Sequence, residues 1–296
     1  MATLKEVQLK ISGVKKTKQI TSAMKMVATS RLRGAQLAME AFRPYAEKYA
    51  EVLGSLAQKA GEGASPLLEA REEVKKIHVV LMTSDRGLCG GFNINLIETA
   101  EKLIKEKEGE DVEISFTNFG KRGRDWVRKQ ELTRVDEYLG VVGSKVGFSV
   151  ASTAGKKLID SFLAGEYDEV YMIYANFVSM GKQVPVIQQI LPIPPIEAEE
   201  EEIDANAPFQ AEHICEPSAD ALLGEMLPRN VYIQLFSGLL ETSTSEHAAR
   251  MSAMDNATKA CSDMIDELKT LFNKARQAAI TADLMDIVGG AEALKG

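Results

Sequence analysis

The sequence predicts an α/β fold combined with a long antiparallel two-helix coiled coil, and three observations support this class. Both ends of the chain repeat their apolar residues with a period of seven. The middle of the chain alternates apolar runs with helical stretches, and no proline follows Pro228. We therefore expect two long terminal helices that flank a central Rossmann-like α/β domain.

The N-terminal segment, residues 1–60, is predicted to be one coiled-coil helix. Two heptad series run through it: Leu4, Ile11, Lys18, Lys25, Leu32, Met39, Ala46, Leu53, and Val7, Val14, Thr21, Ala28, Ala35, Phe42, Tyr49, Leu56. A seam sustained over this many heptads is typical of a coiled coil. Pro44 is the only proline in the segment, and we expect a kink there because proline removes a helical hydrogen bond.

Residues 61–75 are predicted to be a linker, and residues 76–195 an α/β domain. Four apolar runs in this domain have the length and composition of strands: 77–84, 112–119, 169–179 and 184–193. Helical stretches separate the first three runs: 92–107, 121–130 and 145–164. Alternation of this kind predicts a mainly parallel sheet. Residues 196–218 then form an acidic, proline-containing connection to the last segment.

The C-terminal segment, residues 219–296, is predicted to be the second coiled-coil helix. Its seam residues recur in alternating steps of four and three: Leu240, Thr244, His247, Met251, Met254, Thr258, Cys261, Ile265, Leu268, Phe272, Ala275, Ala279, Ala282. Gly289 and Gly290 are expected to end the helix. Because one helix with a single apolar seam does not fold alone, the two terminal segments are expected to pair antiparallel.

A glycine-rich loop, SDRGLCGGFN at residues 84–93, follows the first apolar run and precedes a helix. Backbone N–H groups at such a turn bind phosphate in many α/β proteins. The loop lacks GxGxxG, a Gly-Lys-Ser/Thr ending and a later acidic residue for a ribose. We therefore interpret Gly87, Gly90 and Gly91 as a structural strand-to-helix turn. A nucleotide-binding α/β enzyme that uses residues 87–91 is the alternative.

Composition bears on other function classes. The net charge of −8 argues against a nucleic-acid binder, although the first 59 residues carry 11 Lys and Arg against 4 Glu and keep a basic nucleic-acid-binding coil as a second alternative. The three cysteines are far apart, which disfavours a disulfide framework or zinc site: Cys89, Cys215 and Cys261. No acid, base and nucleophile group around the three histidines: His78, His213 and His247. We therefore expect no catalytic residue, no metal and no cofactor.

No apolar stretch approaches the ~20 residues that span a bilayer, so any membrane association is expected to occur through a partner. The N-terminus shows neither a signal-peptide core nor a transit peptide, which favours a bacterial protein.

Four segments, in order along nearly the whole chain, resemble the γ subunit of F-type ATP synthase: QITSAMKMVATSRLRGAQ (19–36), TSDRGLCGGFNINL (83–96), SEHAARMSAMDNAT (245–258) and FNKARQAAITADLMDIVGGAEAL (272–294). The resemblance implies a bacterial central-stalk rotor whose terminal helices form a shaft inside a ring of three α and three β subunits. It places the α/β domain at the foot, near the ε subunit and the membrane c ring. It also implies mechanical coupling of proton translocation to ATP synthesis or hydrolysis, no active site in this chain, and a peripheral position on the cytoplasmic face of the inner membrane.

The resemblance further implies roles for particular residues. Contacts with the α and β subunits are carried over to these positions: Met24, Lys25, Arg31, Arg33, Arg250, Arg276, Gln277 and Thr281. A bearing tip is carried over to Ala282, Ile287 and Val288. A foot contact with the c ring or ε is carried over to Glu216, close to His213 and Cys215, where the chain departs from many bacterial relatives.

Overall fold

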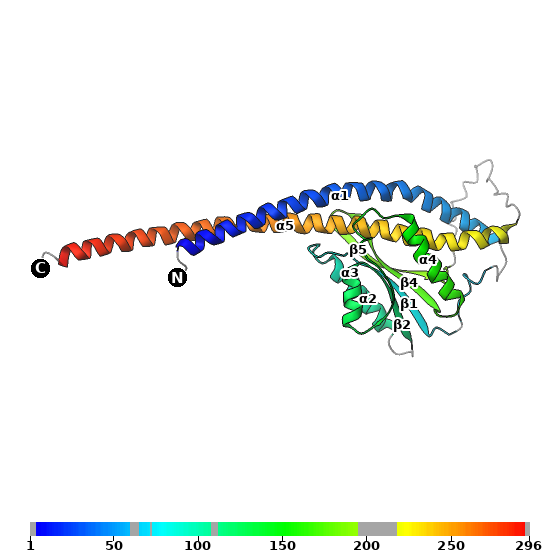
Figure 1. Ribbon diagram of the computed structural model, residues 1–296. Helices are drawn as coiled ribbons and strands as arrows, with labels where there is room; N and C mark the ends of the chain where they lie inside the picture. Colours follow the sequence, from blue (N-terminus) through cyan, green and yellow to red (C-terminus); the bar gives the residue numbers. More distant parts are fainter. Residues whose placement is uncertain (1–3, 60–64, 72, 108–111, 195–217, 294–296) are drawn as a thin grey trace, which may run out of the picture. The chain divides into compact units, whose positions relative to one another are not determined.

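The computed structural model describes residues 4–59, 65–71, 73–107, 112–194 and 218–293 (Figure 1). Its helices and strands occur in this order: α1 (Leu4–Lys59), β1 (Lys76–Met82), α2 (Phe92–Lys107), β2 (Glu113–Phe119), α3 (Lys121–Lys129), β3 (Thr133–Tyr138), α4 (Phe148–Leu163), β4 (Glu169–Ser179), β5 (Lys182–Leu191) and α5 (Ala219–Ala293).

The chain divides into two compact units, and α1 and α5 contribute to both. Residues 1–28 and 250–296 form the first, termed here the helical-pair unit. Residues 29–249 form the second, termed the sheet unit. The division therefore falls inside the two long helices.

The sheet unit contains one five-stranded sheet in the order β3-β2-β1-β4-β5. The first four strands are parallel, and β5 runs antiparallel to β4. The four apolar runs predicted as strands and the mainly parallel sheet are confirmed. Strand β3 was not predicted, because its sequence TRVDEY forms a mostly exposed edge strand and contains no apolar run.

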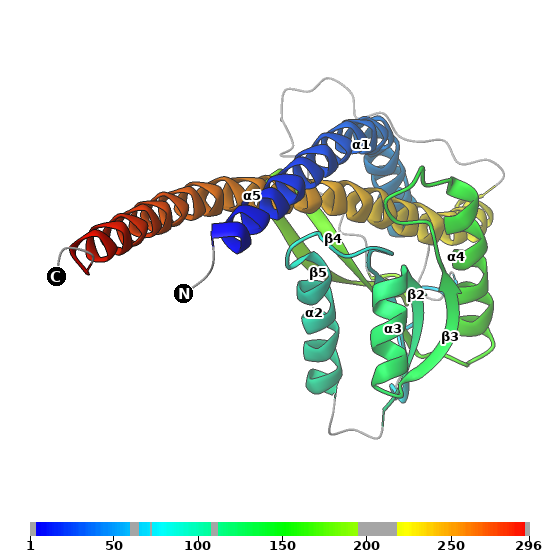
Figure 2. The same ribbon diagram turned by 60° about the vertical axis from the view of Figure 1, so that its left-hand side comes forward.

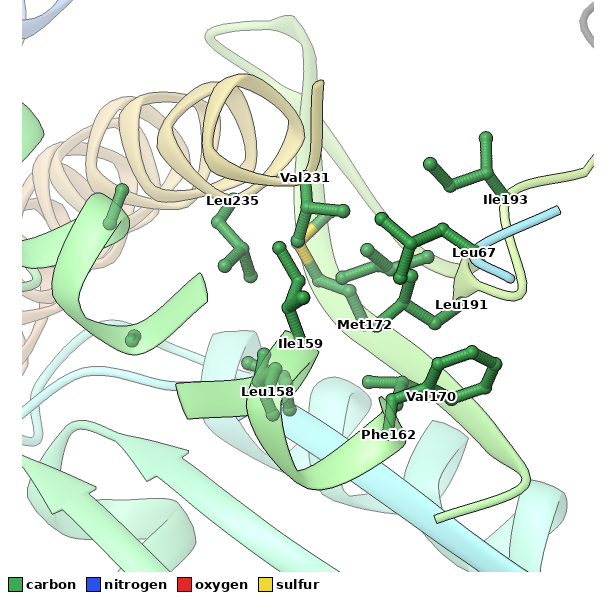
Figure 3. Close-up of a cluster of buried hydrophobic side chains, with 14 of the residues drawn as sticks. Leu67, Leu158, Ile159, Phe162, Val170, Met172, Leu191, Ile193, Val231 and Leu235 are labelled. Carbon is green, nitrogen blue, oxygen red and sulfur yellow. The ribbon is translucent and has the colours of Figure 1, made fainter. Parts of the chain in front are cut away.

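Helices cover both faces of this sheet, so its central strands are buried on both sides. Helices α2 and α3 lie side by side on one face (Figure 2). Helix α4 and residues 219–249 of α5 pack on the other face; Figure 3 shows Val231 and Leu235 of α5 directed toward Ile159 of α4. Along β1 the residues alternate between the two cores, with Val79 and Leu81 on the α2 side and Met82 on the α5 side.

The predicted seam of the N-terminal helix is confirmed. Positions in the two heptad series are buried or half-buried along α1, whereas most positions between them are exposed. Val7, Thr21 and Ala28 are buried within the helical-pair unit. Helix α1 includes Pro44 and continues to Lys59.

The C-terminal helix differs from its prediction in one respect. Gly289 and Gly290 were expected to end it, but α5 continues to Ala293. A glycine inside a helix costs only about 1 kcal/mol relative to alanine, and Ala291 and Ala293, which follow, are strong helix formers. Glycine therefore weakens the last turn without ending it. No helix among the described residues combines the length and apolar character required to cross a membrane.

Candidate partner-binding surface

A polar layer joins the two helices of the helical-pair unit. The Oγ1 atoms of Thr21 and Thr258 are hydrogen-bonded at 2.8 Å. One turn further along α1, the Lys25 ammonium donates to Asp255 Oδ1 at 2.6 Å. Because the pairs run in opposite directions along the two helices, they show the antiparallel pairing that the sequence predicts.

The Asp255 carboxylate is held by two cations. Its second oxygen, Oδ2, accepts from the Lys259 ammonium at 2.8 Å, one turn along the same helix. Hydrogen bonds from Lys25 and Lys259 lower the pKa of Asp255 to about 2. The carboxylate is therefore charged at neutral pH, and Lys25 is directed across the helix pair.

The helix pair ends before α5 does. Thr21 faces Thr258, so Leu4, 17 residues earlier on α1, falls opposite about residue 275, 17 residues later on α5. Ala279 is the last half-buried seam residue, and residues 280–291 are all exposed. The prediction that Ala282 lies in the seam is therefore wrong, because the described part of α1 begins too late to cover it.

This exposed stretch of α5, residues 280–291, is termed the tip. It carries five large apolar side chains that are more than half exposed: Ile280, Leu284, Met285, Ile287 and Val288. Ile287, at 72 %, is the most exposed of them. A run of exposed apolar residues on an unpaired helix marks a surface for a partner.

The residues carried over as α and β contacts lie at several places. Met24 and Lys25 are half-buried on α1, in the helical-pair unit. Arg31 and Arg33 are exposed on α1 but belong to the sheet unit. Arg250 is half-buried on α5.

Other carried-over residues lie toward the end of α5. Arg276, Gln277 and Thr281 are exposed, and the Thr281 hydroxyl donates to the Gln277 carbonyl at 2.9 Å. The carried-over tip residues, Ala282, Ile287 and Val288, are all in solvent. The last of the set, Glu216, lies outside the described residues.

Polar groups of the glycine loop form hydrogen bonds within the loop and with neighbouring turns. Gly90 has φ +60°, a conformation that favours glycine. The Asn93 side chain accepts from the Ser84 backbone N–H at 2.9 Å and donates to the Cys89 sulfur at 3.1 Å. Asp85 accepts from the Lys121 N–H, at the start of α3, and from the Gly140 N–H, each at 3.0 Å. These bonds tie the loop to neighbouring turns, as a structural strand-to-helix turn requires.

The usual ligand crevice of the sheet is also filled. In open α/β sheets, ligands bind at the carboxyl ends of the strands where the strand order reverses, here between β1 and β4. Helix α5 enters at this point: Thr242 is fully buried and lies against the Met82 sulfur and the Ala175 backbone of β4. Residues of α5 therefore occupy this part of the crevice in the sheet unit.

The histidines and cysteines among the described residues can be assigned their contacts in the fold. His78 is buried and hydrogen-bonded to the hydroxyls of Ser115 and Thr117. The His247 ring lies 2.9 Å from the Glu246 carboxylate. Neither Cys89 nor Cys261 forms a disulfide, and no cluster of metal-binding side chains occurs in the part of the chain that the structure describes. His213 and Cys215 lie outside it.

Two residues with structural contacts at these places, Asp255 and Thr242, were not predicted from the sequence. Asp255 follows the seam position Met254, and its charge is opposite to that of Lys25. These charges could have predicted an ion pair between the two helices, but only with knowledge of their register. Thr242 lies in a polar run of α5, residues 242–247, and hydrophobic periodicity does not predict that such a run is buried.

The fold and this surface define a protein that contains an α/β domain and an antiparallel helix pair, one helix of which continues as an exposed end. Comparison with known proteins identifies the family. The family model described as ATP synthase matches residues 3–294. The ATP synthase gamma chain of Desulfosudis oleivorans is 67% identical over 298 residues, with 100% of both chains covered. That of Desulforapulum autotrophicum is 66% identical, with 99% of this chain and 100% of the relative covered.

A solved structure shares the fold. A chain in the cryo-EM structure of Euglena gracilis mitochondrial ATP synthase, OSCP/F1/c-ring in rotational state 3, matches with a TM-score of 0.66 and 18% identity, covering 98% of this chain and 94% of that one. The protein belongs to the ATP synthase γ-chain family.

Proposed function

We propose that the chain is the central-stalk rotor of a bacterial F-type ATP synthase. In this role it couples proton translocation through the membrane c ring mechanically to ATP synthesis or hydrolysis on the α/β hexamer. The exposed tip of α5 carries the proposal. Five large apolar side chains on an unpaired helix are unfavourable in water. An apolar sleeve at the axis of a subunit ring would cover them.

The proposal assigns roles to the carried-over residues. The eight contact residues from Met24 to Thr281 engage the α and β subunits, and Ala282, Ile287 and Val288 act as a bearing. Glu216 and the rest of the 196–218 connection belong to the foot, next to ε and the c ring. Residues 1–60 and 219–296 serve as the shaft helices, and residues 76–195 as the foot domain.

Coupling requires that the rotor contact the β subunits differently in different states. A partner shifts a conformational equilibrium only through its differential affinity for the two conformations. An asymmetric helix pair presents a different face to each β subunit as it turns, which meets this requirement. The chain then needs no active site and no cofactor. It binds no nucleic acid, and it contacts the membrane only through its partners, on the cytoplasmic face.

Reconstitution tests the proposal. Purified α and β subunits are mixed with and without the chain, and complex formation and ATP hydrolysis are measured. We expect one copy to join the α/β hexamer and raise turnover, while the chain alone neither binds nor hydrolyses ATP. ATP binding by the chain alone, with no association to α and β, would instead support the glycine-loop enzyme.

A pair of matched variants tests the tip. Ile287→Glu places a charge on the tip, and Leu163→Glu places one at the end of α4, on a side chain that is 51 % exposed. We expect Ile287→Glu to lower the ATP synthesis of the full complex at least several-fold and Leu163→Glu to leave it near the wild-type rate. Equal rates for both variants would remove the tip as a bearing.

A further inference from the structure

Strand β4 extends beyond its neighbour β1 at the carboxyl end of the sheet. The last residue of β4 that pairs with β1 is Ile173, opposite Leu81. Strand β4 then continues to Ser179 with β5 on its other side. Ala175 lies in this extension, opposite Pro185 on β5. Because β1 no longer pairs with β4 at this point, backbone groups on that side of β4 need partners from outside the described sheet.

Helix α5 supplies both partners. The Ala175 N–H donates to Thr242 Oγ1 at 3.3 Å, and the Ser245 hydroxyl donates to the Ala175 carbonyl at 3.1 Å. Thr242 and Ser245 are completely buried, and Ala175 is 2 % exposed. Since they are three residues apart on α5, the two hydroxyls lie on the same face of the helix.

Neighbouring contacts bring α5 close to the sheet at the same place. A Cβ on Gly238, one turn before Thr242, would lie 2.7 Å from the Met172 sulfur of β4. On another side of the helix, the Gly143 N–H donates to the Ser243 hydroxyl at 3.3 Å. This approach places the helix within hydrogen-bonding distance of a strand backbone.

We propose that Thr242 and Ser245 are positioning residues that lock α5 against rotation and sliding on the sheet, so that torque applied to the sheet unit reaches the helix. Apolar packing is non-directional and tolerates small rotations of a helix. Two hydrogen bonds to the N–H and the carbonyl of one residue, in contrast, require one orientation of the helix. The crevice in which other α/β proteins bind ligands thus holds the shaft helix α5 in place. This inference rests on the proposed rotor function and names the contact through which torque passes from the sheet to the helix.

The test uses the complete ATP synthase in inverted membrane vesicles. The variant Thr242→Val/Ser245→Ala removes both hydroxyls. The matched control, Thr244→Val/Ser262→Ala, removes two hydroxyls whose hydrogen bonds among the described residues go to carbonyls of their own helix, those of Leu240 at 2.8 Å and Thr258 at 3.1 Å. ATP hydrolysis and ATP-driven proton pumping are measured in the same vesicles. We expect protons pumped per ATP to fall at least twofold in the first variant and to stay at the wild-type ratio in the control.

An unchanged ratio in Thr242→Val/Ser245→Ala would overturn the inference while the rotor function stands. Absence of pumping by the wild-type complex would count against the rotor function itself. If the double variant fails to assemble, hydrogen exchange on the isolated full-length chain decides. The lock predicts at least tenfold faster exchange in a β4 peptide containing Ala175 for Thr242→Val, with protection restored in Thr242→Ser. Equal protection in Thr242→Val and the wild type would refute it.

Discussion

Acidification should weaken the sheet unit through His78, which is held neutral in the folded chain. Burial lowers the pKa of His78 from 6.5 to about 4, and the charge of Asp136 acts weakly in the opposite direction. The ring nitrogens lie 2.7 Å from the Ser115 hydroxyl and 2.9 Å from that of Thr117, and the ring stacks on Tyr167 with centroids 4.2 Å apart. Both described hydrogen-bond partners of the ring are hydroxyls, so a proton added to the ring gains no carboxylate from them.

The size of the effect follows from the two pKa values. Between pH 6.5 and 4 the unfolded chain binds a proton at His78 and the folded chain does not, so stability is fully present above pH 6.5 and falls as the pH decreases. A difference of 2.5 pKa units at 1.36 kcal/mol per unit amounts to about 3 kcal/mol by pH 4, of which about 2 kcal/mol is lost by pH 5.

Urea unfolding at pH 7, 6 and 5, followed by Trp126 fluorescence, measures this loss. Trp126 is the only tryptophan in the sequence and packs, half-buried, against a core cluster of the sheet unit, so its fluorescence reports on that unit. The control His78→Gln keeps hydrogen-bonding capacity and cannot titrate. The wild type should lose about 2 kcal/mol more than His78→Gln between pH 7 and 5. Parallel pH dependence in the two proteins, or an NMR titration of His78 near pH 6.5, would refute the reasoning.

Two further predictions concern helix packing. Gly155→Ala should lower the free energy of unfolding by about 2 kcal/mol, because its Cβ would lie 2.4 Å from the Tyr232 ring and overpacking exceeds the gain in helix propensity. Gly224→Ala, for which no surrounding atom lies within 4 Å of the added Cβ, should raise the free energy of unfolding by up to about 1 kcal/mol. Thermal unfolding of both variants measures this, and melting temperatures that shift in the same direction would contradict the two predictions. Asp255→Asn should loosen the helix pair, since the lowered pKa of Asp255 reflects an interaction with Lys25 that is present above pH 3.8 and lost as the pH falls toward 2. Amide exchange in α1 at pH 7 measures this, and unchanged protection around Lys25 would rule it out.

The sequence by itself determined the elements whose burial follows a simple period. The heptad positions of α1, and those of α5 as far as Ala279, are buried or half-buried, because a helix with one apolar stripe is stabilised when that stripe packs against another element. The apolar runs of β1, β2 and β4 likewise predicted strands of a mainly parallel sheet. Strand β3 was not predicted because it is an exposed edge strand, which forms through backbone pairing and has no apolar run in its sequence.

Tertiary structure alone decided how these elements meet. The pairing of Lys25 with Asp255 depends on the register of two segments 230 residues apart, and neither residue carries that information locally. The end of the seam at Ala279 likewise depends on where α1 begins opposite α5. The burial of Thr242 and Ser245 of α5 against the backbone of Ala175 also joins segments that are far apart in the sequence. Contacts between distant segments are specified by packing and hydrogen bonding in three dimensions, and hydrophobic periodicity records only which face of each element is buried.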